Sequence, residues 1–170
     1  MKVLGIDPGL RITGYACLQP RVLARGSARA GGVGLGPAAM LLEAGVFRFK
    51  PGRSISDRLA ELDADLREVL ERTAPEAVAV EKLYAHYKHP TTAIIMGHAR
   101  GVVLLNIKRA GLKLIELGAT EVKKSLTGNG HAGKPQMQEG VRSQLGLAAR
   151  PEPADVADAM AIALCALRRA

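Results

Sequence analysis

The stretch VLGIDPGLRITGYACL, residues 3–18, defines how the fold of this chain begins. Its apolar run Val3–Ile6 stops at the turn sequence Asp7–Gly9, and a strand-like pattern resumes over Ile12–Leu18. Two apolar strands joined by a turn predict a β-hairpin. The turn also leaves an acidic side chain, Asp7, at the end of an apolar strand, where an ionised group is costly unless a partner stabilises it.

Residues 19–43 differ in character from the hairpin before them. They are rich in Gly, Ala and Arg and show no apolar periodicity. We interpret this stretch as an atypical insertion and expect the third strand at Gly45–Phe49. A disordered linker is one reading of the insertion, and additional nucleic-acid contacts through its arginines are the other.

The remaining pattern alternates strands and helices. Apolar residues at helical spacing predict a helix over Ile55–Leu70, capped by Ser54 or Ser56, and the compact strand Ala77–Val80 then leads into Glu81. Further elements are expected in this order: a helix from Pro90 to about Ala110, a strand Leu112–Leu117, a short helix 120–126, a Gly-rich loop 128–134, a weak helix Pro135–Leu145, and a last helix from Pro153 to about Arg169. This order predicts one α/β domain over residues 1–170, with a mixed sheet.

The composition favours a polyanionic partner. The chain carries 24 Lys and Arg against 16 Asp and Glu, a net charge of +8, and it is 48% hydrophobic, as expected of a globular domain with a buried core. Nucleic acid is the simplest such partner, although ribosomal and other basic proteins share this charge.

Cys17 and Cys165 lie in apolar stretches, so we expect both to be reduced core residues of a cytoplasmic protein. No signal-peptide or membrane-spanning pattern is present, so we expect no membrane partner.

Four carboxylates, those of Asp7, Glu81, Asp155 and Asp158, lie where apolar residues or turns are expected. Asp155 and Asp158 are three residues apart on one helix face, and every residue between Asp158 and Arg168 is apolar. Oxygen-only ligands suit hard cations such as Mg²⁺ or Mn²⁺, and two such ions can catalyse phosphodiester hydrolysis. The alternative for each is ordinary: turn chemistry for Asp7, a solvated strand end for Glu81, and solvated helix-start charges for the pair.

Four motifs together resemble the RuvC family of Holliday junction resolvases, and the resemblance covers nearly the whole chain. They are Gly5-Ile6-Asp7-Pro8-Gly9-Leu10-Arg11-Ile12-Thr13-Gly14-Tyr15, Ala79-Val80-Glu81-Lys82-Leu83-Tyr84, Gly97-His98-Ala99-Arg100-Gly101 and Ala154-Asp155-Val156-Ala157-Asp158-Ala159-Met160-Ala161-Ile162-Ala163. Their order, spacing and flanking residues agree with the family, which is more specific than any one motif.

This resemblance implies a ribonuclease H-like fold with a mixed five-stranded sheet flanked by helices. It also implies a homodimer that resolves four-way DNA junctions by paired symmetric incisions, in homologous recombination and DNA repair. By the same resemblance Asp7, Glu81, Asp155 and Asp158 are the catalytic metal ligands, for Mg²⁺ or alternatively Mn²⁺, with two ions per site. Metal-activated water would leave 5′-phosphate and 3′-hydroxyl ends, and RuvA and RuvB are implied as partners.

The resemblance also implies DNA-binding residues outside the carboxylate set. Tyr84 matches an aromatic position that can stack on a base, and Tyr87 lies close to it in sequence. Lys123 and Lys134 match basic positions near the active site and are expected to contact phosphate. Arg100 matches a recurring residue, for which packing or a salt bridge is the alternative.

The predicted helix Thr91–Ala110 has apolar residues on several faces and two small residues, Gly97 and Gly101, at a spacing that permits close approach. We interpret it as part of a dimer interface that presents two active sites to opposed junction strands.

Four other functions fit parts of this sequence. Residues Gly128–Lys134 fit a nucleotide phosphate-binding loop, but Pro135 follows where a hydroxyl is needed, and the preceding segment is expected to be helical. The Asp7 hairpin also fits actin-like ATPases, which require two lobes and a longer chain. The closer alternatives are another ribonuclease H-like nuclease acting on RNA or other DNA structures, and a non-catalytic nucleic-acid-binding domain.

Overall fold

Residues 1–21, 39–83 and 90–169 are described by the computed structural model. Within them the strands are β1 Val3–Asp7, β2 Ile12–Pro20, β3 Ala39–Arg48, β4 Ala77–Glu81 and β5 Lys113–Leu117. The helices are α1 Ile55–Thr73, α2 Pro90–Arg109, α3 Ala119–Thr127, α4 Lys134–Leu145 and α5 Ala154–Arg169. The helices lie where the sequence predicted them. Ser54 is the N-cap of α1, as predicted, and its hydroxyl accepts a hydrogen bond from the Asp57 amide at 3.1 Å.

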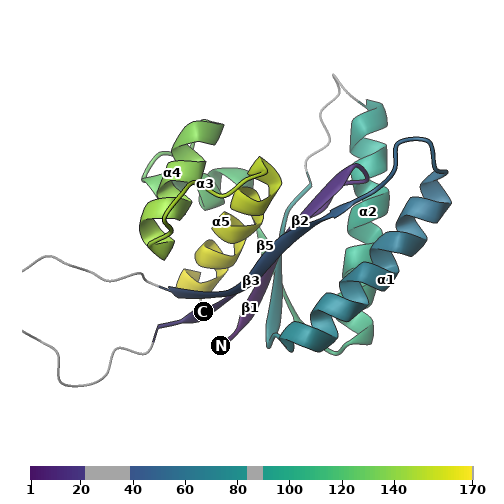
Figure 1. Ribbon diagram of the computed structural model, residues 1–170, viewed down its shortest axis with the longest axis horizontal. Helices are drawn as coiled ribbons and strands as arrows, with labels where there is room; N and C mark the ends of the chain where they lie inside the picture. The colour runs from purple at the N-terminus through teal and green to yellow at the C-terminus, as the bar shows by residue number, and fades with distance from the viewer. Residues whose placement is uncertain (22–38, 84–89, 170) are drawn as a thin grey trace, which may run out of the picture.

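The strands form one mixed sheet in the order β3-β2-β1-β4-β5, which confirms the predicted five-stranded sheet. β1, β2 and β3 are antiparallel neighbours, whereas β4 runs parallel to both β1 and β5. Helices α1 and α2 cover one face of the sheet, and α3, α4 and α5 lie on the other (Figure 1). Because β1 and β4 are parallel, the strand ends that carry Asp7 and Glu81 meet at the same edge of the sheet.

The third strand starts earlier than predicted. β2 continues to Pro20 and β3 begins at Ala39 rather than at Gly45, with Pro20 paired to Ala39 and a register shift between Cys17 and Leu18. Both ends of the predicted 19–43 insertion are therefore strand, and residues 22–38 lie outside the described residues. The sequence obscured this start because β3 is an edge strand whose side chains are mostly half-buried, which weakens the two-residue alternation.

A buried threonine fixes the turn that follows Asp7. The Gly9 amide donates to the Thr13 hydroxyl at 3.0 Å, and this hydroxyl donates to the Gly9 carbonyl at 2.7 Å. A Cβ on Gly9 would lie 2.4 Å from the Ile12 carbonyl oxygen, so the turn has no room for a side chain there. The turn sequence therefore holds the end of β1, and with it Asp7, in one place.

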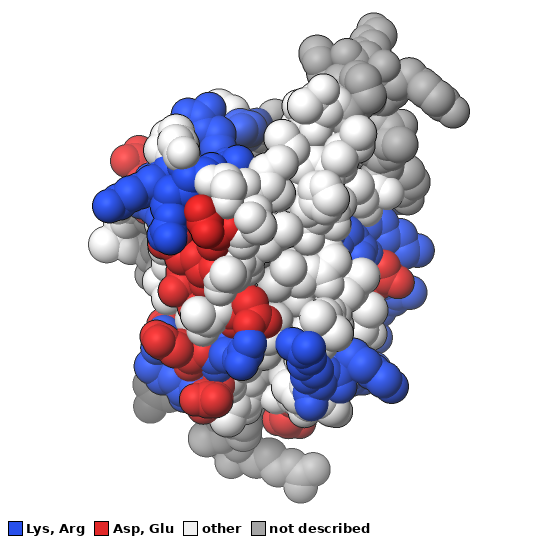
Figure 2. Space-filling model, turned by 90° about the vertical axis from the view of Figure 1, so that its right-hand side faces the viewer, with Lys and Arg blue, Asp and Glu red and all other residues white. Residues whose placement is uncertain are grey.

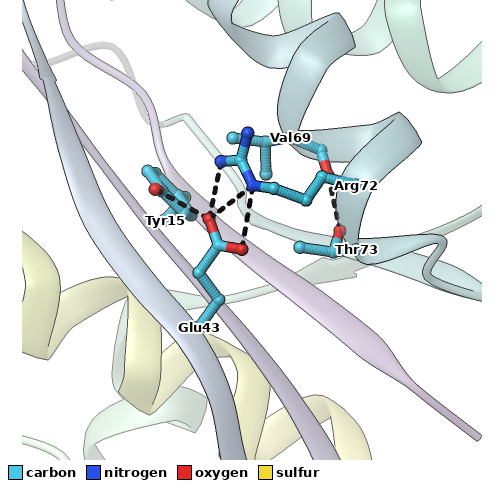
Figure 3. Close-up of polar contacts among 5 residues, drawn as sticks. All are labelled: Tyr15, Glu43, Val69, Arg72 and Thr73. Atoms are coloured by element: carbon cyan, nitrogen blue, oxygen red, sulfur yellow. Dashed lines mark hydrogen bonds and ion pairs between the residues drawn. The ribbon is translucent and has the colours of Figure 1, made fainter.

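One polar network joins β2, β3 and α1 on the face opposite α5 (Figure 3). Arg72 donates two hydrogen bonds to the Glu43 carboxylate, from Nε to Oε2 at 3.1 Å and from Nη2 to Oε1 at 2.6 Å. The Tyr15 hydroxyl donates a third hydrogen bond, to Glu43 Oε1 at 3.1 Å. The Tyr15 ring stacks on Phe47, with centroids 4.9 Å apart. The hydrogen bonds from Arg72 lower the pKa of Glu43. The network therefore ties the end of α1 to the outer strands.

Replacing Glu43 with Gln is expected to lower the free energy of unfolding by ~0.5–1 kcal/mol at pH 7, because Arg72 is half exposed and water screens the pair. Because the pKa of Glu43 is lowered in the folded state, the ionised carboxylate contributes its full stabilisation above pH 4.5. This contribution to the free energy of unfolding is lost as the pH falls through the folded-state pKa. Urea unfolding should show the difference from wild type at pH 7 and a smaller difference at pH 3. Glu61→Gln, which breaks the exposed pair with Arg53, is the matched control. A difference of the same size at pH 3 and pH 7 would contradict the electrostatic explanation.

The prediction for the two cysteines is confirmed. Cys17 and Cys165 are buried free thiols, as their apolar surroundings predicted. In the described parts of the chain, none of the helices has the length and apolar character needed to cross a membrane.

Candidate active site

Three elements bring carboxylates into one cleft. Asp7 ends β1 and Glu81 ends β4, and the strands are in register at Ile6 and Val80, one residue before each acid. Asp158 comes from α5, which packs on β1 and β2. The cleft has a volume of about 370 Å³, and its lining also includes Ala119, Val122, Lys123, Ala132, Gly133, Lys134 and Met137. The structure thus assembles acids that are far apart in sequence.

Helix α5 is buried around most of its circumference, as its apolar sequence predicted. Residues Ala159–Ala166 are all buried, because β1 and β2 pack on one side of the helix and α3 and α4 on the other. Asp155 and Asp158 are half-buried at its first turns. Asp158 lines the cleft, whereas Asp155 lies beside it, close enough to raise the pKa of both Asp7 and Asp158.

The site holds its acids under strong mutual repulsion. Burial, followed by the charges of Asp158, Glu81 and Asp155, raises the pKa of Asp7 to about 7, against the opposing effect of Lys134. Burial and Asp158 raise the pKa of Glu81, and burial and Asp155 raise that of Asp158. Like charges gathered in a desolvated cleft are the electrostatic condition that a divalent cation relieves.

The donor set fits a hard divalent cation. Among the described residues, none of the four carboxylates takes part in a salt bridge or accepts a side-chain hydrogen bond, so their oxygens remain available. As they stand, however, no three His, Cys, Asp or Glu side chains in the described parts of the chain are close enough to hold one ion. The fit to a cation therefore lies in the chemistry of the donors, which are all carboxylate oxygens.

The two predicted lysines lie in the same cleft as the acids. Lys123 projects from α3 and Lys134 begins α4, and both line the cleft. Lys134 lowers the pKa of Asp7 and of Asp158, and Lys123 lowers that of Glu81. Neither lysine is within salt-bridge distance of an acid in the described chain, so both ammonium groups are available to an anionic ligand.

The other predicted DNA-binding residues have different outcomes. Tyr84 and Tyr87 lie outside the described residues. Arg100 forms an ion pair with Glu116 on β5, and its side chain is only 11% exposed. The salt bridge that the sequence left open as an alternative is therefore present, and the DNA contact of Arg100 stays a prediction.

An apolar wall that no sequence pattern indicated lines one part of the cleft and is formed by Val122, Ala132 and Met137. Periodicity identifies a buried face of a short helix but not the element that it covers, so no local signal could locate this wall. The segment Gly128–Gly133 lies between α3 and α4, so the phosphate-loop hypothesis lacks the preceding strand that it requires.

The chain matches known proteins along almost its full length. Residues 3–166 match the family model described as Crossover junction endodeoxyribonuclease RuvC. The chain is 47% identical to the Crossover junction endodeoxyribonuclease RuvC of Rhodopirellula baltica, over 96% of this chain and 84% of the relative. Its structure is similar to that of Thermus thermophilus RuvC, with a TM-score of 0.79 at 36% identity, covering 97% of this chain and 92% of the other. Thermus thermophilus RuvC in complex with Holliday junction substrate matches with a TM-score of 0.83 at 35% identity, covering 99% and 94%.

Proposed function

Because the chain belongs to the RuvC family of crossover junction endodeoxyribonucleases, we propose that its carboxylate cleft cuts the strands of Holliday junctions. The protein is a nuclease with a ribonuclease H-like fold, in a family of metal-dependent enzymes. The observation that carries the proposal is the meeting of Asp7, Glu81 and Asp158 in one open cleft with Lys123 and Lys134. Acids that hold cations beside free lysines suit a phosphodiester substrate.

The four carboxylates would hold the metal, and we assign them Mg²⁺, with Mn²⁺ as the alternative and two ions per site. When bound, such ions stabilise charge on the phosphate and lower the pKa of water. Asp7 is the acid whose pKa the other three all raise, which supports a central place for it in the ligand set. Glu81, Asp155 and Asp158 then complete the set from two other elements.

Water is the nucleophile in this proposal, and the products carry 5′-phosphate and 3′-hydroxyl ends. The described lining of the cleft contains no Ser, Cys or His that could attack phosphorus. Lys123 and Lys134 would attract and orient the phosphate by point charge. The apolar wall at Val122 and Met137 limits access of bulk water from one side.

Two-fold assembly is part of the proposal, because α2 exposes a largely apolar stripe without acidic, Lys or Arg side chains. Ile94, His98, Gly101 and Leu105 follow one another at spacings of three or four residues and are all exposed, with Ile94 61% and Leu105 46% accessible. The opposite side of α2, at Ala99, Val103 and Ile107, is buried in the core. The face of the molecule that carries α1 and α2 has a broad area without charged residues (Figure 2).

The glycines of α2 support a second copy as the occupant of this stripe. A Cβ on Gly97 or Gly101 would meet no atom of the described residues within 4 Å, so packing against that part of the subunit does not require glycine at either position. Glycine in a helix interior costs ~0.5–1 kcal/mol relative to alanine. Close approach of another helix explains why both are present, and a symmetric dimer would place two clefts on opposed junction strands. By family we extend the proposal to cooperation with RuvA and RuvB in the cytoplasm.

Cleavage of three substrates tests this function. A synthetic four-way junction, a linear duplex of the same sequence and an RNA–DNA hybrid should be compared in Mg²⁺, in Mn²⁺ and in EDTA. We expect paired nicks in the junction, at least ~100-fold faster than cleavage of the duplex, which corresponds to ~2.7 kcal/mol in the barrier. Equal cutting of junction and duplex, or preference for the hybrid, would contradict the proposal. Junction binding without cleavage in either metal would favour a non-catalytic domain.

A further inference from the structure

Gly14 lies where the catalytic elements meet. It is the cross-strand partner of Asp7 in the ladder between β1 and β2. A Cβ atom on Gly14 would lie 2.0 Å from the carbonyl oxygen of Asp155 and 3.2 Å from the amide nitrogen of Val156. One face of Gly14 is therefore in direct contact with the first turn of α5, and its backbone is paired with the strand end that carries Asp7.

A second glycine repeats this contact farther along α5. A Cβ on Gly5 would lie 2.3 Å from the carbonyl oxygen of Ala159 and 2.7 Å from the amide nitrogen of Ala163. Both glycines belong to the two strands on which α5 packs. Helix α5 thus rests on strand backbone at two points, with no side chain between.

Space, and not backbone conformation, is the reason for glycine at position 14. Only Gly111, Gly128 and Gly146 have positive φ among the described glycines, so the conformation of Gly14 is open to other residues. Ordinary Cβ contacts begin at 3.4 Å, so an added methyl group would displace the first turn of α5 by about 1 Å or more. The rest of α5 is held by α3 and α4, so the displacement concentrates at the end that carries Asp155 and Asp158.

We propose that Gly14 is a positioning residue for the active site, whose direct contact with the Asp155 carbonyl sets the separation between Asp7 and the two α5 carboxylates. The inference rests on the proposed metal-dependent cleavage. It adds a residue that holds none of the reacting groups itself. Its substitution should therefore weaken metal binding and the chemical step but leave binding of the junction intact.

The test compares Gly14→Ala with Gly45→Ala in the full-length protein. Gly45 is also crowded, since its Cβ would lie 2.8 Å from the Tyr15 hydroxyl oxygen, but its nearest neighbour is the Tyr15 side chain and not α5. We expect Gly14→Ala to lower the single-turnover cleavage rate on the order of 100-fold and the affinity for Mn²⁺ without DNA about 10-fold. Junction affinity measured in Ca²⁺ should stay within about twofold of wild type, and Gly45→Ala should retain both rate and Mn²⁺ affinity.

Circular dichroism and calorimetric Mn²⁺ titration accompany the kinetics at a temperature where both variants are folded. The inference would be overturned if Gly14→Ala kept the wild-type cleavage rate and Mn²⁺ affinity. It would also be overturned if Gly45→Ala lost as much cleavage rate and Mn²⁺ affinity as Gly14→Ala. If Gly14→Ala has no folded state, Gly5→Ala tests the same spacing between helix and strand farther along α5, at Ala159 and Ala163, with smaller expected losses of cleavage rate and Mn²⁺ affinity; wild-type values in that variant would overturn the inference. If the wild type itself does not cut junctions, the proposed function fails, and the Mn²⁺ affinities of the variants still decide whether Gly14 positions the carboxylates.

Discussion

Replacing Asp7 with Asn is expected to abolish junction cleavage and, in the metal-free protein, to raise the free energy of unfolding. Loss of the central carboxylate removes charge stabilisation worth several kcal/mol, so cleavage should fall at least ~10³-fold. The stability gain has a separate cause. Burial and three neighbouring acids raise the pKa of Asp7 to about 7, so the ionised carboxylate destabilises the folded state.

The pH dependence follows from the direction of this shift. A folded-state pKa raised from 3.8 to about 7 means that the penalty is absent below pH 4 and complete above pH 7. Since each pKa unit corresponds to ~1.4 kcal/mol, the gain in Asp7→Asn should reach up to ~4 kcal/mol at pH 8. Urea unfolding in EDTA at pH 4 and pH 8 measures it.

Asp65→Asn is the control for this comparison. Burial and the neighbouring charges of Glu61 and Glu68 raise the pKa of Asp65 too, but this residue lies on α1, across the sheet from α5. We expect the Asp65→Asn variant to cleave junctions at the wild-type rate. Cleavage that survives in Asp7→Asn would refute the metal site, and a loss of stability at pH 8 would refute the electrostatic account of the cleft.

The double substitution Ile94→Glu with Leu105→Glu is expected to make the protein monomeric and to uncouple the two incisions. Both side chains are exposed in the subunit, so the fold should tolerate the charges. In the dimer, the two new carboxylates would lie in an apolar interface and lose their contact with water. The dimer dissociation constant should therefore rise more than ~100-fold, which corresponds to ~2.7 kcal/mol. Analytical ultracentrifugation measures the association.

A plasmid with an extruded inverted repeat reports the coupling of incisions. Paired cutting converts it directly to linear DNA, whereas independent cutting accumulates nicked circles. Met40→Glu is the control, because Met40 is a similarly exposed apolar residue, 46% accessible, on β3 and away from α2. A double variant that stays dimeric, or a monomer that still linearises the plasmid in one step, would contradict the assignment of α2 to the interface.

Local signals predicted most elements and failed where tertiary pairing replaced them. Ser54 marked the start of α1 correctly, because a helix cap acts through atoms a few residues away. The early start of β3 at Ala39 was missed, because an edge strand is stabilised by its pairing with β2 and not by its own apolar alternation. Arg100 illustrates the same limit, since its partner Glu116 lies on another element.

The sequence by itself determined the kind of chemistry: strand-ending acids, an apolar helix that carries two aspartates, and a basic chain. Only the tertiary structure decided which groups share a cleft, how strongly their charges interact, and that Lys123, Lys134 and an apolar wall complete it. Turns and helices depend on neighbours along the chain. The separation between Asp7 and Asp158 depends instead on how closely a helix lies on a sheet, and at Gly14 that distance is set by the absence of a side chain.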